Sequence, residues 1–253
     1  MQFANIADKF IFGKKNKRKA IAMRNDGRKN NELRPVKFTK DFTKNALGSV
    51  LVEFGDTRVI TTASVEMKQP KWMDKESSQG WVTAEYSLLP SSTSTRCERE
   101  RNKISGRTQE IQRLIGRSLR ACVDMNKIPK MTITIDADVI QADGGTRTAS
   151  ICGGFLALKI AIQKLLDKGL LNENPIKEEI AAISVGIVDG EVRLDLCYEE
   201  DSKAQVDSNV VMTKSGKIIE FQTTAEGEPY NQEQLFKIFE TAKLGIDTII
   251  KMY

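Results

Sequence analysis

The sequence ADGGTRTAS, residues 142–150, joins two segments of different hydrophobic period. Before it, residues 131–140 alternate as a strand does, and after it residues 148–168 repeat apolar side chains at helical spacing. Paired glycines let the backbone come close to an anion, and the first amides of the following helix point toward that anion. Arg147 adds a positive charge, so the junction is a candidate phosphate site. Because the Gly-Lys-Ser/Thr ending of a P-loop is missing, a tight turn without a ligand is the alternative.

Strand and helix patterns alternate along the rest of the chain. Strand-like segments with short turns typical of hairpins are residues 48–54, 57–65, 81–88, 181–188, 191–196, 209–213 and 217–222. Helical spacing recurs in residues 108–126 and after Asn231, whose spacing to Gln234 resembles a capping box. The mixed order predicts an α+β chain that folds as one compact body, since no linker rich in Pro, Gly or Ser divides it.

The chain has 253 residues and no histidine. This absence excludes Ser-His-Asp and Cys-His nucleophile systems and zinc sites that use histidine. The four cysteines form no C-x-x-C pair, and we expect free thiols in a reducing cytoplasm. No uncharged apolar run approaches the ~18 residues that span a bilayer, so we expect no membrane partner.

The net charge of +5 is unevenly distributed. Residues 1–44 carry 13 Lys or Arg and 4 Asp or Glu, whereas the remainder carries 26 and 30. We expect residues 1–22 to be a disordered basic extension, which is either a contact for a polyanion or a solvated leader. Residues 96–120 form a second basic segment that is richer in arginine, and the planar guanidinium suits phosphate. This second segment is the better candidate for a phosphodiester track.

Two further constellations point to phosphate chemistry. Arg107 stands at the start of a predicted helix, where the helix dipole disfavours a cation, so either an anionic ligand or a neighbouring carboxylate would compensate it. An acidic group comprises Asp195, Glu199, Glu200, Asp201 and Asp207. Oxygen ligands without His or Cys favour Mg²⁺ or Mn²⁺, and a solvated acidic loop is the alternative. Together the sites predict phosphoryl transfer on a polyanion, with inorganic phosphate as a nucleophile that needs no histidine base.

Several stretches carry a resemblance to a known family. They are residues 23–28, 48–57, 80–86, 106–121, 138–151, 201–213 and 224–229. From residue 23 onward the chain resembles the bacterial ribonuclease PH family, phosphate-dependent exoribonucleases that trim the 3′ ends of tRNA precursors. The resemblance implies a ribosomal protein S5 domain 2-like fold with duplicated β-α halves over residues 23–253, assembled as a homohexamer (a trimer of dimers) in the cytoplasm.

The activity that the resemblance implies is 3′-to-5′ phosphorolysis of tRNA precursors and other RNA 3′ ends. Nucleoside diphosphates are released, and the reverse reaction adds nucleotides to RNA. The implied phosphate-binding residues are Arg107, Gly145, Thr146 and Arg147. Asp201 and Asp207 are the implied catalytic carboxylates, which would bind Mg²⁺ (or Mn²⁺) and assist departure of the 3′ oxygen. The implied RNA-binding residues are Arg96, Arg99 and Arg101.

Three features depart from the family pattern. Residues 1–22 have no counterpart, Ser91 stands where the family has an RNA-contacting arginine, and the loop before Arg107 is about two residues shorter. The serine and the shortened loop put the affinity for tRNA in question but leave the phosphate site intact. Two other functions remain open: a hydrolytic metal-dependent exonuclease, and a catalytically weak RNA-binding ring subunit, against which the retained Arg147 and Asp201 argue.

Overall fold

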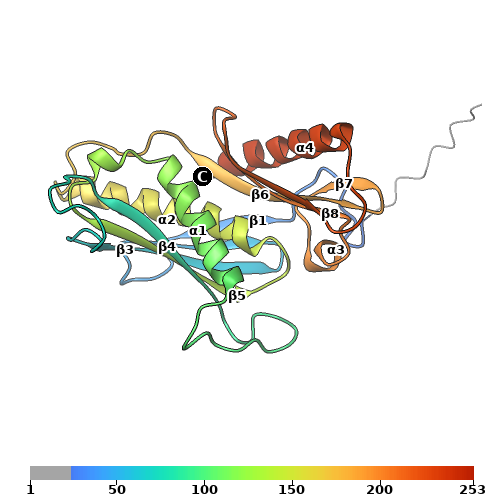
Figure 1. The fold of residues 1–253 in the computed structure, drawn as a ribbon, viewed down its shortest axis with the longest axis horizontal. Coiled ribbons are helices and arrows are strands. Elements are labelled where there is room, and N and C mark those ends of the chain that lie inside the picture. The colour runs from blue at the N-terminus through green and yellow to red at the C-terminus, as the bar shows by residue number, and fades with distance from the viewer. Residues whose placement is uncertain (1–23) are drawn as a thin grey trace, which may run out of the picture.

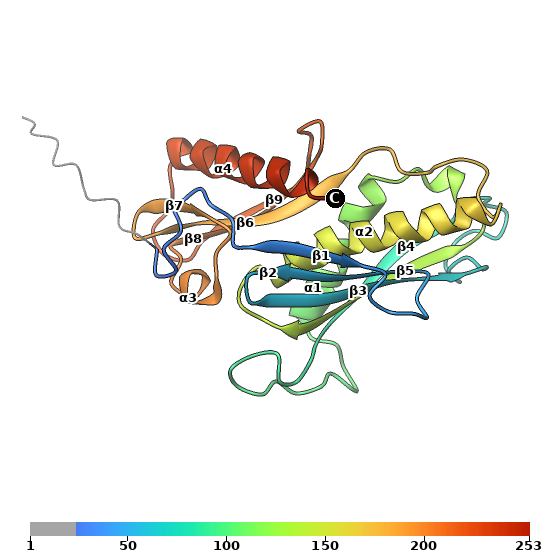
Figure 2. The same cartoon turned by 180° about the vertical axis from the view of Figure 1, so that it is seen from behind.

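The computed structural model describes residues 24–253, and the basic extension predicted at residues 1–22 lies outside this range. Two sheets follow one another along the long dimension of the molecule (Figures 1 and 2). Helices α1 and α2 pack on the first sheet, and α4 packs on the second. This arrangement is the predicted α+β fold, with a sheet and its helices in each half.

The first sheet has the strand order β1-β2-β3-β5-β4. Its strands are β1 (Val36–Lys40), β2 (Gly48–Phe54), β3 (Thr57–Glu66), β4 (Trp81–Leu88) and β5 (Thr132–Gln141). The β2–β3 hairpin predicted from the sequence is confirmed, and Gly55 adopts φ +57° in its turn. Only the β4–β5 pair is parallel among these strands, because α1 lies in the connection between them.

Two helices cover one face of this sheet. Helix α1 (Gly106–Ala121) buries the predicted apolar stripe against β4, and α2 (Thr146–Asp167) packs on β2, β3 and also β6 of the second sheet. Because α2 contacts both sheets, it is apolar almost all round. By length and composition it is the one helix of the described chain that could cross a membrane, but 72% of its most apolar window is buried inside the protein, as in a core helix.

The second sheet has the order β7-β6-β8-β9 and is antiparallel throughout. Its strands are β6 (Ile180–Val188), β7 (Glu191–Leu194), β8 (Val206–Thr213) and β9 (Ile218–Ala225). Helix α4 (Gln232–Ile250) covers it, and Asn231 forms the predicted capping box with Gln234. A short helix, α3 (Tyr198–Asp201), connects β7 to β8.

Some predicted boundaries are wrong. The helix expected over residues 108–126 begins at Gly106 and ends at Ala121, and a separate 3₁₀ turn occupies Met125–Lys127. The apolar spacing continued through Cys122 and so did not reveal the end of the helix. Strand β1 and helix α3 were not predicted, because five mixed residues within a basic segment and four acidic or aromatic residues carry no clear period.

A buried ionic network joins the beginning of the described chain to the second half. Arg24 donates to both carboxylate oxygens of Glu200, with 2.8 Å between its Nε and Oε1, and to the backbone oxygen of Leu194 at 2.7 Å. Arg34, two residues before β1, makes a two-pronged contact with Asp195 at 2.7 and 3.0 Å. The side chains of these four charged residues are at most 6% exposed. The network therefore connects β1, an edge strand of the first sheet, to the segment that joins β7 to α3.

This network should be essential for stability. Burial alone raises the pKa of Glu200, but its hydrogen bond with Arg24 and the charges of Arg24 and Arg28 outweigh burial, and the net pKa is lowered. We expect Glu200→Gln to reduce the free energy of unfolding by about 3–5 kcal/mol, because it leaves buried guanidinium groups uncompensated. Urea denaturation measures this loss.

The neighbouring Glu199, which is exposed and paired with Lys203, supplies the matched control Glu199→Gln. A carboxylate with a lowered pKa stabilises the fold above its unfolded-state pKa, and this contribution is lost as the pH falls through the folded-state pKa. The difference between wild type and Glu200→Gln should therefore shrink in acid. Equal losses of unfolding free energy in Glu199→Gln and Glu200→Gln at neutral pH would contradict the stabilising role of the buried network.

Candidate anion-binding and catalytic site

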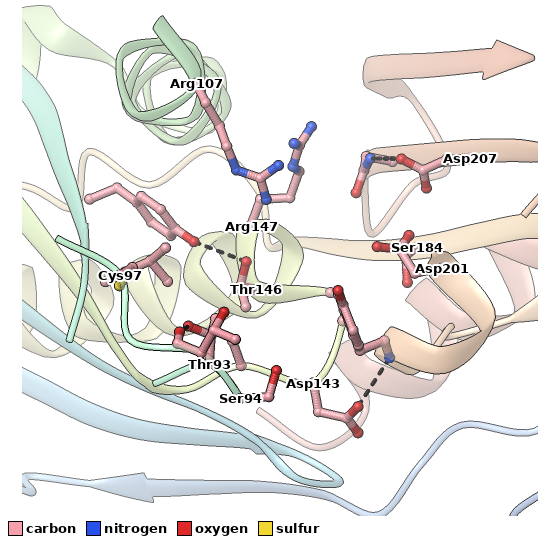
Figure 3. Close-up of a pocket in the computed structure, with 18 of the residues that line it drawn as sticks. Thr93, Ser94, Cys97, Arg107, Asp143, Thr146, Arg147, Ser184, Asp201 and Asp207 are labelled. Atoms are coloured by element: carbon pink, nitrogen blue, oxygen red, sulfur yellow. Dashed lines mark hydrogen bonds between the residues drawn. The ribbon is translucent and has the colours of Figure 1, made fainter. Parts of the chain in front are cut away.

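A pocket of about 470 Å³ opens where the starts of α1 and α2 meet α3 and β8 (Figure 3). Seven of the predicted site residues line it: Arg96, Arg107, Gly145, Thr146, Arg147, Asp201 and Asp207. They come from both halves of the molecule, namely from α1, α2, α3 and β8 and from the loops that precede α1 and α2. Arg99 and Arg101 do not line the pocket and are exposed on the loop that follows β4.

The floor of the pocket is the start of α2. Gly144 and Gly145 have φ +71° and +65°, and Gly145 is the N-cap residue. A side chain at Gly144 would place its Cβ 2.5 Å from the backbone oxygen of Leu196, so only glycine fits there. No side chain caps this helix, and its first turn has no acidic residue. The positive end of a 22-residue helix therefore faces the pocket without an anion from its own cap or first turn.

Two arginines add to this positive charge. Arg107 lies in the first turn of α1, whose N-cap is Ser105, and in the described chain no carboxylate lies within 4.0 Å of its guanidinium. Arg147 lies in the first turn of α2, where it makes two long contacts: an ion pair of 3.6 Å with Glu110 and a hydrogen bond of 3.4 Å donated to the side-chain oxygen of Gln222. Cations at helix starts are electrostatically unfavourable by themselves. The alternative of a carboxylate partner is thus wrong for Arg107, and an anion in the pocket would offset both misplaced charges.

Tyr86 was not predicted as a site residue. It projects from β4, and its hydroxyl forms a hydrogen bond of 2.9 Å with the hydroxyl of Thr146 (Figure 3). Burial raises the pKa of Tyr86, so the phenol stays neutral beside Arg107 and Arg147. The sequence predicted a strand over residues 81–88, but nothing in that pattern indicated the hydrogen-bond partner of Tyr86.

The predicted acidic group does not form one cluster. Asp195 and Glu200 are buried against arginines, and Glu199 is exposed. Only Asp201, from the end of α3, and Asp207, from β8, face the pocket opposite the arginines (Figure 3). The single cluster of five is therefore wrong, because the β7–α3 turn sends successive carboxylates to different sides of the backbone.

The two remaining carboxylates influence each other. Burial, followed by repulsion from Asp201, raises the pKa of Asp207 to about 6, although Arg147 opposes the shift. Burial also raises the pKa of Asp201, against the charges of Arg147 and Arg107. Asp207 accepts one long hydrogen bond, 3.4 Å, from Asn209. A proton or a cation shared by the pair would relieve their repulsion.

This donor set fits a hard divalent cation. Over residues 24–253 no group of three or more Cys, Asp or Glu side chains is placed to hold a metal ion. Asp201 and Asp207 would therefore supply two oxygen ligands, and water and substrate phosphate the rest. Mg²⁺ is commonly bound in this way, through one or two carboxylates and substrate phosphates.

Part of the predicted basic track serves the fold instead. Arg117 pairs with Glu220 of β9 at 3.0 Å. Arg120 donates to the backbone oxygen of Val82 at 3.0 Å and lies 4.5 Å above the ring of Trp81. The arginines from Arg96 to Arg107 therefore remain as the candidate polyanion contacts of this segment.

Comparison with known proteins places the site in a family. The model of the 3′ exoribonuclease family, domain 1 (RNase_PH), matches residues 32–163, and the model of domain 2 (RNase_PH_C) matches residues 178–245. The boundary between the two matches falls between α2 and β6, where the first half of the fold ends.

Solved structures share this fold. Rrp46 of rice (Oryza sativa) is 22% identical with a TM-score of 0.70, over 86% of this chain and 92% of that chain. A chain of the Archaeoglobus fulgidus exosome with RNA bound to the active site is 19% identical with a TM-score of 0.75, over 91% and 92%. A chain of an archaeal exosome core is 20% identical with a TM-score of 0.69, over 86% and 85%. At such identities the likeness concerns the fold alone.

The geometry predicts that the pocket binds inorganic phosphate. Phosphate should raise the thermal unfolding midpoint of the wild type, since it binds only the folded protein. Arg107→Ala should weaken binding about tenfold, which corresponds to ~1.4 kcal/mol, as measured by titration calorimetry. Arg113→Ala removes an equally exposed arginine of α1 that does not line the pocket, and should leave the affinity unchanged. Equal affinities of the two variants would contradict the assignment of Arg107.

Proposed function

The chain belongs to the 3′ exoribonuclease family of the ribonuclease PH type, and on that premise we propose that it shortens RNA from the 3′ end by phosphorolysis. One observation carries the proposal: two arginines and the positive end of α2 face two carboxylates across a single pocket. The arginines and the start of α2 can bind an attacking phosphate, and the two carboxylates can act on the departing oxygen.

In the proposed reaction an oxygen of bound phosphate attacks the phosphorus of the last phosphodiester. The bond from that phosphorus to the 3′ oxygen of the preceding nucleotide breaks, and the terminal nucleotide leaves as a nucleoside diphosphate. Arg107, Arg147, the Thr146 hydroxyl and the amides at the start of α2 hold the phosphate and neutralise charge on the transferring group. Phosphate is already anionic near neutral pH, so a chain without histidine needs no strong base to activate it.

The carboxylates act on the other side of the reacting phosphorus. Asp201 and Asp207 would hold Mg²⁺ (or Mn²⁺), which when bound supplies positive charge to the leaving 3′ oxygen. Without a bound ion, burial and the charge of Asp201 raise the pKa of Asp207 to about 6, so part of this carboxyl is protonated near neutral pH and can give a proton to the leaving oxygen. A bound ion would favour the ionised carboxylate and would itself stabilise that oxygen.

The substrate that we propose is the 3′ end of tRNA precursors and of other RNAs. Arg96 lines the pocket, and the exposed Arg99 and Arg101 lie on the same loop, from which the three arginines would contact the RNA backbone. We propose a homohexameric ring, a trimer of dimers, as the working assembly. The fold similarity to exosome chains, one of them in a complex with RNA at its active site, supports both RNA binding and ring assembly.

A second candidate function is a catalytically weak RNA-binding subunit of a ring. The fold similarity to exosome subunits favours it. The complete set of Arg107, Arg147, Asp201 and Asp207 in one pocket favours the active enzyme.

Product analysis distinguishes these functions. Incubated with single-stranded RNA, Mg²⁺ and inorganic phosphate, the wild type should release nucleoside diphosphates, and without phosphate it should release almost nothing. With excess nucleoside diphosphate it should extend the RNA, because one phosphate linkage replaces another of similar energy. Thin-layer or liquid chromatography identifies the products. Nucleoside monophosphates in the absence of phosphate would indicate a hydrolase, and bound RNA without turnover would indicate the weak subunit.

Substitutions within the pocket should abolish this activity without unfolding the protein. Removing a group that neutralises transition-state charge typically costs about 10²–10³-fold in rate, and we expect losses of this size for Arg147→Ala and Asp207→Asn. Circular dichroism and thermal melts check the fold. Arg58→Ala removes an exposed arginine that pairs with Glu53 and does not line the pocket, and it should retain activity. Full phosphate-dependent activity in Arg147→Ala would refute the role of that residue.

A further inference from the structure

The turn that forms the floor of the pocket is held from behind by a buried threonine. The Thr57 hydroxyl accepts a hydrogen bond from the amide of Asp143 at 3.0 Å and donates one to the backbone oxygen of Gly144 at 2.6 Å. Thr57 is fully buried at the start of β3 and does not line the pocket. One hydroxyl therefore fixes two consecutive residues of the turn.

An arginine makes a second attachment to the same turn. Arg34 donates to the backbone oxygen of Asp143 and, at 3.4 Å, to that of Gly144, while its other side-chain contacts go to the carboxylates of Asp195 and, at 3.5 Å, Asp143. Arg34 faces a second hollow, of about 600 Å³, on the far side of the turn. Asp195 is itself fully buried and donates its amide to the oxygen of Ser184 in β6. The turn is thus fixed to the second sheet through Arg34.

These attachments decide which way the peptide groups point. In a trans peptide the carbonyl and the following amide point in opposite directions. The oxygens of Asp143 and Gly144 point to Arg34 and Thr57, so the amides of Gly144 and Gly145 point the opposite way, toward the anion pocket. Glycine adopts positive and negative φ with similar ease, so a Gly-Gly turn has little preference of its own for this orientation. A flipped peptide would present a carbonyl oxygen to the anion and repel it.

We propose that Thr57 and Arg34 are positioning residues that lock the peptides of Asp143–Gly145 with their amides toward bound phosphate. The proposal deepens the proposed function and rests on it in one respect, namely that the anion is the attacking phosphate. The two residues act through the turn and touch neither the phosphate nor the RNA.

Threonine substitutions test the lock with little change of shape. Thr57→Val removes only the hydroxyl and should raise both the dissociation constant and the KM for inorganic phosphate about tenfold, while kcat changes less than threefold. Thr57→Ser retains the hydroxyl and should restore the phosphate affinity. Thr61→Val is the matched control, because Thr61 is equally buried on β3 but its hydroxyl bonds the oxygen of Val50 instead of the turn. It should leave the phosphate affinity unchanged, whatever its effect on the unfolding midpoint.

The outcomes separate the inference from the proposed function. Equal phosphate affinity in Thr57→Val and Thr61→Val would overturn the inference. Should Thr57→Val fail to fold, Arg34→Lys replaces it: lysine keeps the charge beside Asp195 but lacks the fork that reaches the carbonyls, and the same loss of phosphate affinity is expected. A wild type that binds phosphate but releases no nucleoside diphosphates would overturn the proposed function alone, since calorimetry still tests the lock. A wild type that binds no phosphate would overturn both.

Discussion

Positive charge at two helix starts, which the long ion pair of Arg147 with Glu110 offsets only in part, is the constraint on which the site depends. Arg107 and Arg147 stand where the helix dipole already supplies positive charge, and the start of α2 has neither a side-chain cap nor an acidic residue in its first turn. Folding alone gains nothing from this arrangement, and a structural role would have favoured Asp, Ser or Glu at these positions. An anion placed between the two helices removes the cost. The position of the binding site can therefore be inferred from an arrangement of charges that is unfavourable without a bound anion.

The two halves of the fold must be held together because each contributes charged groups to the same site. The arginines and the Gly-Gly turn belong to the first half, whereas Asp201 and Asp207 belong to the second. Small movements between the halves would separate the nucleophile site from the carboxylates, and displacements of about 1 Å can cost catalysis ~10²-fold. Arg24 and Arg34, paired in the interior with Glu200 and Asp195, resist such movement. Burying charge is costly by itself, but a two-pronged pair gives a fixed geometry.

Much of this organisation could be predicted from the sequence, and the exceptions have a physical reason. Periodicity located the hairpins and the three long helices, and local spacing located the cap at Asn231, because these features depend on neighbours along the chain. The glycine pair and Arg147 could be recognised because a strand, a turn and a helix start follow in order. The burial of Asp195 and Glu200 in ion pairs could not be predicted, because their partners Arg34 and Arg24 lie 161 and 176 residues away in the sequence. Thr57 and Tyr86 escaped notice for the same reason: their hydroxyls act on residues of another element.

The proposal of phosphate and not water as the nucleophile rests on the charge of the pocket. Water attacks a phosphodiester effectively only when a base or a metal removes its proton, and this pocket contains no histidine to serve as that base, while burial raises the pKa of Tyr86. The carboxylates could serve water in principle, but they lie opposite two arginines whose charge has no role in holding a neutral molecule. A phosphate anion would use every element of the pocket: Arg107 and Arg147 would attract it, the amides at the start of α2 would donate hydrogen bonds to it, and Asp201 and Asp207 would be left to act on the departing oxygen. A pocket that activated water would need the two carboxylates but not the two arginines.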